Sequence, residues 1–277
     1  MTSSRRNRNP LFWLALVLLS LVFVGPVAMM ILTSFKTRVE SQTVPPTFLP
    51  QEWTTRAYEV LFAADSTTPV LRWFLNSMLA AAGHAVLVAI VCSMAGYALA
   101  RLTFPGRGVI FGVIISTLFV PGFIFLMPNF EMMSRLAWLD SYLALIVPGA
   151  AGAFGVFFMR QFFLGLPVEL EESARIDGAG PWRIFVSIVL PNARAAVVTL
   201  LVISFLANWN DFVWPLYVMF STEMLTIPIG LSRLQGAYTI DYPVIMAGAT
   251  VAAVPVLLLY VFVQRYIIEG VASSGIK

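Results

Sequence analysis

The stretch EESARIDGAGPWRIFVSIVLP, residues 171–191, lies between two long hydrophobic segments of a chain of 277 residues. Its charges and glycines stand out, because 59 % of the chain is hydrophobic and only 11 % is charged. Soluble domains carry roughly 25 % charged residues, whereas this chain has a mean hydropathy of +0.86. The composition therefore predicts an all-α integral membrane protein, in which residues 171–191 form a polar segment outside the bilayer.

The first half of this segment is predicted to be a short helix followed by a sharp turn. Pro167 can occupy the first turn of a helix without the loss of a hydrogen bond, and residues 168–176 continue that helix. Three carboxylates in its early turns suit the positive end of the helix dipole: Glu169, Glu171 and Glu172. Gly178 and Gly180 permit the backbone dihedrals of a sharp turn.

The second half is predicted to be another short helix, which Pro181 can begin and Pro191 ends. Its apolar residues recur at helical spacing and predict one apolar face: Trp182, Phe185, Val186 and Val189. Such a helix pair either rests on lipid headgroups or projects into a groove on a cytoplasmic partner. Surface-lying helices prefer Lys and Arg on their polar face, so three acidic residues beside the anionic inner leaflet disfavour the first alternative.

Six segments outside this loop are long and apolar enough to cross a bilayer, which takes about 20 mostly apolar residues. They are residues 11–33, 75–99, 109–127, 142–159, 195–214 and 244–263. The first could instead be a cleaved signal peptide, but its apolar run exceeds the typical length of about 7–15 residues. We therefore expect residues 11–33 to be a retained span.

The orientation of the spans follows from Lys and Arg, because cytoplasmic segments carry an excess of these residues. With the N-terminus inside, the inner segments hold eleven basic and five acidic residues, and the outer segments hold six basic and nine acidic residues. Both termini are therefore predicted to be cytoplasmic. The predicted inner segments include residues 1–10, 160–194 and 264–277, and the long outer loops are residues 34–74 and 215–243.

The spacing within the cytoplasmic loop resembles a known family pattern. Three residues separate Glu172-Ser173-Ala174 from Gly178, and nine more separate Gly178 from Ile188, which Leu190-Pro191 follow after one residue. This spacing matches the EAA loop of ABC importer permeases, which reads E-A-A, three residues, G, nine residues, I-x-L-P. Ser173 stands where the family usually has its first alanine, a small change at a small position.

Further segments resemble the carbohydrate-importer branch of these permeases, specifically the second, maltose-type permease subunit. They are Asn76-Ser77, Tyr97-Ala98, Phe104-Pro105-Gly106, Trp209-Asn210-Asp211-Phe212, Pro215-Leu216, Gln264-Arg265-Tyr266 and Gly275-Ile276-Lys277. The resemblance covers nearly the whole chain, although the tail lacks the final glycine that is frequent in the family. It implies a type I importer permease of the bacterial inner membrane, with six transmembrane helices and a cytoplasmic pair of coupling helices.

The resemblance also implies a set of partners. The chain would form a heterodimer with a second, homologous permease, and two copies of an ATP-binding subunit would dock on its cytoplasmic side. An extracytoplasmic solute-binding protein would deliver a sugar or sugar-like solute, such as an oligosaccharide or a glycerol phosphate. Membrane lipid would surround the spans, and no nucleic acid is expected, because the basic residues are explained by topology.

The implied contact with the ATPase rests on residues of the cytoplasmic loop: Glu172, Ser173, Ala174, Asp177, Gly178, Leu190 and Pro191. By resemblance, Glu172 would lie in the groove of the ATPase. Gly178 would let the helix pair bend, and Leu190-Pro191 would anchor its return to the membrane.

The sequence itself excludes a phosphate-binding loop of the form G-x-x-x-x-G-K-[ST]. The chain has two lysines, Lys36 and Lys277, and neither follows a glycine. We therefore expect no cofactor and no catalytic residue in this chain, with ATP and Mg²⁺ bound by a partner subunit. One histidine and one cysteine also argue against a cysteine-based metal cluster.

An ion-coupled secondary transporter is the alternative class, and such proteins usually place ionisable residues within their spans. The six predicted span cores hold no Asp, Glu, Lys or Arg apart from Asp211, near the outer end of the fifth. His84 is the one ionisable residue well inside a span. It is either a neutral histidine that bonds between packed helices or part of the transport pathway.

A polar cluster near the end of the fifth span is the candidate substrate pathway: Asn208, Trp209, Asn210, Asp211 and Trp214. Sugar hydroxyls accept and donate hydrogen bonds, and the C–H faces of sugars stack on indole rings. The alternative is that the tryptophans belong to an interfacial aromatic belt and that the amides bond one helix to another. Pro121, Pro128 and Asn129 could also break the third span near this pathway.

Overall fold

The computed structural model describes residues 10–63, 68–234 and 240–274, with side chains up to residue 261. Within these ranges, every regular element is helical, and the prediction of an all-α fold is confirmed. The chain divides into two compact units. The first consists of Met1–Val70 and Gly230–Val254, and the second of Leu71–Ile229 and Pro255–Lys277.

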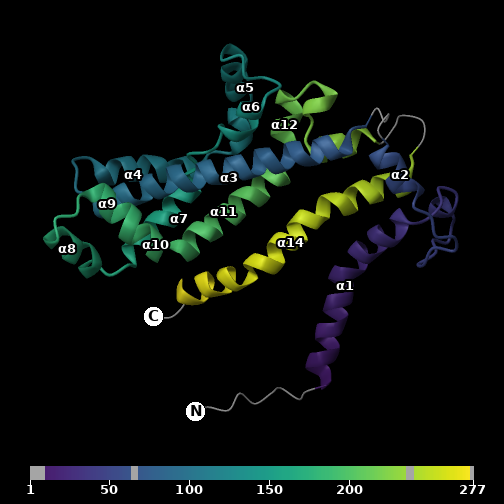
Figure 1. Cartoon of the computed structure of the whole chain (residues 1–277), viewed down its shortest axis with the longest axis horizontal. Helices are drawn as coiled ribbons and strands as arrows, with labels where there is room; N and C mark the ends of the chain where they lie inside the picture. The colour runs from purple at the N-terminus through teal and green to yellow at the C-terminus, as the bar shows by residue number, and fades with distance from the viewer. Residues whose placement is uncertain (1–9, 64–67, 235–239, 275–277) are drawn as a thin grey trace. The chain divides into compact units, whose positions relative to one another are not determined.

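Three helices are by themselves long and apolar enough to cross a membrane (Figure 1). They are α1 (Pro10–Ser34), α3 (Val70–Arg101) and α14 (Tyr242–Ser274), the last through its part Tyr242–Val261. Three more segments pass the same test as bent pairs: Arg107–Phe119 with Gly122–Arg135 at 99°, Ala153–Leu164 with Glu169–Ile176 at 76°, and Pro181–Asn192 with Arg194–Trp209 at 79°. By length and composition the chain therefore has up to six spans, as predicted.

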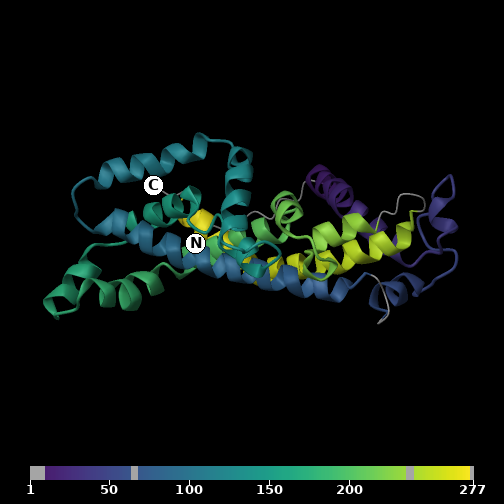
Figure 2. The ribbon, with the colours of Figure 1, turned by 90° about the horizontal axis from the view of Figure 1, so that it is seen from above.

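The segment predicted as one span over residues 109–127 is sharply bent. Helix α4 (Arg107–Ser116) ends within this segment, and α5 (Leu126–Arg135) runs in a different direction from α4 (Figure 2). The break lies at Val120, which is extended with φ −90° and ψ 121°. Pro121 follows it, and a proline disfavours helical geometry in the preceding residue.

The segment predicted as one span over residues 142–159 is also interrupted. Helix α6 (Tyr142–Ile146) is separated from α7 (Ala153–Leu164) by an irregular stretch. Pro148 lies in this stretch, and the next residue, Gly149, has φ +79°. This is a left-handed conformation that residues with a Cβ rarely adopt, so the sequence here breaks the helix locally.

The loop over residues 160–194 forms the two predicted short helices, α8 (Glu169–Ile176) and α9 (Pro181–Ile184). A π turn over Phe185–Val189 leads to α10 (Leu190–Asn192) and then to α11 (Arg194–Trp209). The remaining elements are α2 (Arg56–Phe62), α12 (Val213–Val218), α13 (Ile227–Arg233) and the short 3₁₀ helices Glu40–Gln42, Thr117–Phe119, Gly122–Phe125 and Thr222–Met224.

The fifth span differs from its predicted bounds of 195–214. Helix α11 ends at Trp209, and the chain leaves helical geometry before α12 begins at Val213. Pro215 lies in the first turn of α12, where a missing N–H costs little. The polar residues 210 and 211 consequently form a junction between two helices.

The main core of the second unit joins α3, α7 and the loop over residues 160–194. Its buried side chains include Cys92, Met159, Phe163, Phe185 and Leu200. Helices α3 and α7 approach closely where Cys92 of α3 faces Gly155 of α7. A Cβ added to Gly155 would lie only 2.6 Å from Cys92 Sγ, so a larger residue would not fit there. Small residues at such a crossing allow two membrane helices to pack tightly.

Candidate functional site

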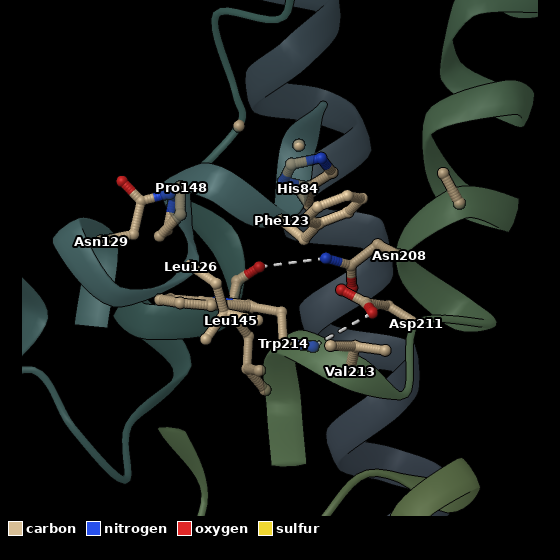
Figure 3. Close-up of a pocket in the computed structure, with 13 residues that line it drawn as sticks. His84, Phe123, Leu126, Asn129, Leu145, Pro148, Asn208, Asp211, Val213 and Trp214 are labelled. Carbon is tan, nitrogen blue, oxygen red and sulfur yellow. Dashed lines mark hydrogen bonds between the residues drawn. The ribbon is translucent and has the colours of Figure 1, made fainter. Parts of the chain in front are cut away.

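A cavity of about 470 Å³ lies within the second unit, beside the break between α6 and α7 (Figure 3). Its polar lining comes from α3, α5, the end of α11 and the start of α12: His84, Asn129, Asn208, Asp211 and Trp214. The apolar lining includes Phe123, Leu126, Pro148 and Val213. The structure thus brings together three of the five residues predicted for the substrate pathway, Asn208, Asp211 and Trp214.

Three of these side chains bind the last carbonyl groups of α6. Trp214 Nε1 donates to Ala144 O at 2.7 Å, Asn208 Nδ2 donates to Leu145 O at 3.0 Å, and His84 Nδ1 lies 2.8 Å from Ile146 O. A carbonyl oxygen can only accept, so Nδ1 of His84 carries the proton in this bond. The final carbonyls of a helix have no partner within it, and within a membrane such irregular backbone requires partners from the protein or a water-filled cavity. These side chains therefore stabilise the broken helix at the wall of the cavity.

Asp211 contributes a different group to the cavity. Its Oδ1 accepts a long hydrogen bond of 3.3 Å from the backbone N of Trp214. Among the described residues that line the cavity, Asp211 supplies the one carboxylate, and none is Lys or Arg. The cavity thus combines hydrogen-bonding groups with apolar and aromatic surface and lacks a fixed positive side chain.

The other two residues of the predicted cluster do not line this cavity. Trp209 is 3 % exposed and packs in a second core cluster, stacked on Phe205 at 5.7 Å and edge-on to Phe74 at 5.7 Å. Asn210 is exposed, and its Nδ2 donates to Leu206 O of its own helix at 2.8 Å. His84 and Asn129 join the site instead. The sequence had marked His84 as a lone ionisable residue in a span and Asn129 as a neighbour of a possible break.

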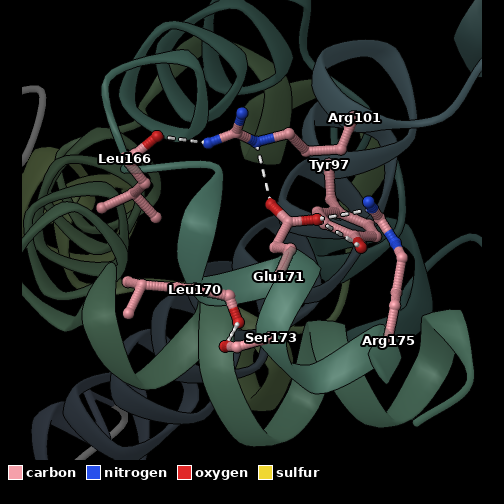
Figure 4. Close-up of polar contacts among 7 residues, drawn as sticks. All are labelled: Tyr97, Arg101, Leu166, Leu170, Glu171, Ser173 and Arg175. Atoms are coloured by element: carbon pink, nitrogen blue, oxygen red, sulfur yellow. Dashed lines mark hydrogen bonds and ion pairs between the residues drawn. The ribbon is translucent and has the colours of Figure 1, made fainter. Parts of the chain in front are cut away.

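The loop over residues 160–194 has an inner face that packs within this chain and an exposed outer face. Glu171 is only 2 % exposed, and it forms ion pairs with Arg101 Nε at 2.9 Å and with Arg175 Nη2 at 3.2 Å (Figure 4). The hydroxyl of Tyr97 donates to Glu171 Oε2 at 3.3 Å. Arg101 Nη2 also donates to Leu166 O, which lies before α8.

Most residues that the resemblance assigned to ATPase contact lie on the outer face of this loop. Glu172, Ser173, Asp177, Gly178 and Pro191 are exposed, whereas Ala174 is buried and Leu190 is half-buried. Gly178 has φ +78° in the turn between α8 and α9, as the sharp turn requires.

The predicted apolar face of the second short helix is only partly buried. Phe185 and Val189 are buried, whereas Trp182 and Val186 are exposed and Ile184 is buried instead. Val186 lies in the π turn over Phe185–Val189, whose spacing departs from the 3.6 residues per turn on which the prediction relied.

Comparisons with known proteins agree with this architecture. Residues 93–272 match the family of binding-protein-dependent transport system inner membrane components. The chain is 34 % identical to the arabinooligosaccharides transport system permease protein AraQ of Halalkalibacterium halodurans, over 99 % of each chain. It is 35 % identical to the sn-glycerol-3-phosphate transport system permease protein UgpE of Pectobacterium atrosepticum, over 76 % of each chain.

A solved structure supports the fold. A chain of a bacterial ABC transporter involved in the import of the acidic polysaccharide alginate superposes with a TM-score of 0.82, at 21 % identity and covering 96 % of this chain and 98 % of that one. Three observations point to the same family: the helices long and apolar enough to cross a membrane, the EAA-type loop, and the similarity to these relatives. The chain belongs to the family of binding-protein-dependent transport system inner membrane components and is a permease subunit of an ABC importer.

Proposed function

We propose that this chain forms half of the translocation pathway for a neutral di- or oligosaccharide. The observation that carries this proposal is the cavity that Asn208, Asp211 and Trp214 line together with His84 and Asn129. Amide and carboxylate groups bind sugar hydroxyls, and Trp214 and Phe123 offer faces on which a sugar ring can stack. Two relatives are named for the transport of arabinooligosaccharides and of lactose, and these names support a sugar substrate.

The charge of the cavity favours a neutral sugar over a glycerol phosphate. A phosphate or an acidic sugar in a low-dielectric site needs a cationic partner, because an unpaired buried charge is costly. The described lining supplies the Asp211 carboxylate and neither Lys nor Arg. A relative named for sn-glycerol-3-phosphate shares the family but does not decide the substrate of this chain.

The partners follow from the same function. The chain would pair with a second, homologous permease, and two ATPase subunits would bind ATP and Mg²⁺ and hydrolyse the ATP. The outer face of α8, with exposed Glu172 and Ser173, is a suitable surface for the ATPase groove. A solute-binding protein would deliver sugar from outside, and both termini of the permease would be cytoplasmic in a bacterial inner membrane.

Uptake by the reconstituted complex tests this proposal. The complex is placed in proteoliposomes with its solute-binding protein and ATP, and uptake of neutral oligosaccharides is compared with that of sn-glycerol-3-phosphate. We expect ATP-dependent uptake of a neutral oligosaccharide and no uptake of the phosphate. Uptake of the phosphate alone would exclude a neutral sugar as the substrate.

A further inference from the structure

The two adjacent glutamates of α8 lie on different faces of that helix. Glu171 is 2 % exposed, whereas Glu172 is exposed. Successive residues of an α-helix are rotated by about 100°, so neighbours can face the core and the outside respectively. The contacts of Glu171 are therefore made within this chain, and Glu172 is accessible to another subunit.

Both carboxylate oxygens of Glu171 have a positively charged partner, although Oε1 and Arg101 Nε pair by charge without forming a hydrogen bond. Oε1 lies 2.9 Å from Arg101 Nε, and Oε2 lies 3.2 Å from Arg175 Nη2 and 3.3 Å from the Tyr97 hydroxyl (Figure 4). A buried carboxylate requires such pairing, because an isolated charge would be strongly disfavoured in this environment. The Arg101 side chain is itself 9 % exposed, so this ion pair is largely shielded from water.

Arg101 also connects two parts of the loop. Its Nε pairs with Glu171 on α8, and its Nη2 donates to Leu166 O just before that helix. One guanidinium therefore holds both the start of the loop and α8 against the end of α3. A lysine could not do the same, because its ammonium is a single point of charge without the planar fork of arginine.

Helix α3 leads from this ion pair to the cavity. Arg101 is its last residue, and His84, which bonds to Ile146 O at the cavity wall, lies on the same helix. Seventeen residues separate them, which is about 25 Å along a helix at 1.5 Å per residue. No proline interrupts α3, so it can move as one element.

We propose that Glu171 is a positioning residue that fastens α8 to α3, so that a displacement of α8 by the ATPase subunits moves α3 and the cavity wall. The inference rests on the proposed coupling function of this loop. It separates the roles of two adjacent residues: Glu172, the first residue of the motif, contacts the partner, and Glu171, directly before the motif, transmits the movement within the permease.

The test is Glu171→Gln, with Glu169→Gln as the control at an exposed position of the same helix. Sugar uptake per ATP hydrolysed and the stimulation of ATPase activity by loaded solute-binding protein are measured per assembled complex. We expect Glu171→Gln to lower both by between about 2-fold and about 30-fold, the usual range for changes in coupling. Basal ATP hydrolysis and the Glu169→Gln variant should stay close to wild type.

A double variant covers the case in which Glu171→Gln does not assemble. Glu171→Gln with Arg101→Gln removes the unpaired guanidinium and leaves two amides at the same place, so the amount of complex should recover while coupling stays impaired. Normal coupling by the double variant would overturn the proposal. A fall in the amount of complex with unchanged coupling per complex would also overturn it, because Glu171 would then be merely structural.

Glu172→Ala distinguishes this inference from the proposed function. If Glu172→Ala is uncoupled and Glu171→Gln couples normally, the loop contacts the ATPase but Glu171 does not transmit the movement. If both variants couple normally, the proposed coupling role of the whole loop fails.

Discussion

Four of the polar residues of the cavity fall into two groups by their hydrogen bonds. His84, Asn208 and Trp214 each bind a backbone carbonyl of the broken helix α6. Asp211 accepts a long bond of 3.3 Å from a backbone N–H, and its side chain contacts no carbonyl of α6. Loss of the first group should affect the amount and stability of the complex, whereas loss of the Asp211 carboxylate should affect transport.

Asp211→Asn should reduce sugar uptake per assembled complex by about fivefold or more, because an unmade bond to a buried polar group costs about 1–3 kcal/mol. The amide keeps the shape of the side chain, so the amount of complex should not change. Asn210→Ala is the matched control, since Asn210 lies next to Asp211 in the sequence but outside the cavity lining. Equal losses in both variants would mean that the predicted five-residue cluster, rather than the cavity, marks the pathway.

His84→Leu should destabilise the complex by about 1–3 kcal/mol, because Ile146 O would lose its hydrogen bond. His84→Asn can place an amide nitrogen near the position of Nδ1 and should recover part of the loss. Thermal unfolding of the detergent-solubilised complex measures both. An unchanged unfolding temperature for His84→Leu would show that another group can satisfy this carbonyl.

At the scale of single elements, the turn between α8 and α9 is set by one backbone conformation. Gly178 has φ +78°, whereas Gly180 has φ −72° and ψ 163°, which other residues adopt readily. A Cβ on either glycine would meet no atom within 4 Å. The two positions therefore differ in backbone strain and not in steric room.

Gly178→Ala should cost about 1–2 kcal/mol through backbone strain, and Gly178→Pro should distort the turn, because proline fixes φ near −65°. Both should impair the stimulation of ATPase activity by loaded solute-binding protein. Gly180→Ala, the control two residues away, should behave as wild type. The role of this turn in coupling would be rejected if the Gly178→Pro complex transported at the normal rate.

The segment between α1 and α2 contains a carboxylate with an acid-dependent contribution to stability. A hydrogen bond from Thr47 to Glu40 Oε1 at 2.7 Å, the backbone N–H of Gln51 and the charge of Lys36 lower the pKa of Glu40 below its ordinary value of 4.5. Because its pKa is lowered in the folded state, the stabilisation is present above pH 4.5 and is lost as pH falls through the lowered value.

The expected result is that the stability of wild type and Glu40→Gln converges in acid. At pH 7 the wild-type complex should unfold at a higher temperature than the variant, and the difference should shrink below pH 4.5. Unfolding temperatures recorded across this pH range provide the measurement. A difference that stays constant with pH would assign the effect to packing and not to the charge of Glu40.

At the scale of the whole chain, charge and hydropathy together predict the topology. The predicted inner segments hold eleven of the seventeen basic residues and five of the fourteen acidic residues. The positive-inside rule predicts that such segments remain in the cytoplasm. The long apolar helices α1, α3 and α14 are consistent with this arrangement.

Reporter fusions test the topology directly. A fusion after Lys277 should report the cytoplasm, and a fusion within residues 34–74 should report the exterior. Both fusion proteins should retain sugar uptake, which would show that the permease is inserted normally. An exterior signal from the fusion after Lys277 would contradict a six-span arrangement with both termini inside.

The sequence by itself determined the all-α membrane class and the transporter family, because hydropathy and the spacing of the EAA-type loop are properties of local sequence. It also marked Gly178, since a turn of this kind depends on one residue's own backbone. It raised a break of the third span at Pro121 as one possibility, and it did not predict the break before α7, because prolines in membrane helices are tolerated when neighbours bind the freed backbone groups.

Only the tertiary structure decided which polar residues act together. Trp209 and Trp214 are close in sequence, yet one packs in a core and the other lines the cavity, because α11 ends between them. Likewise, Glu171 and Glu172 differ in burial because Arg101, seventy residues away, lies against one face of α8. Contacts between distant segments depend on how helices pack, and the local patterns from which the sequence was interpreted carry no such information.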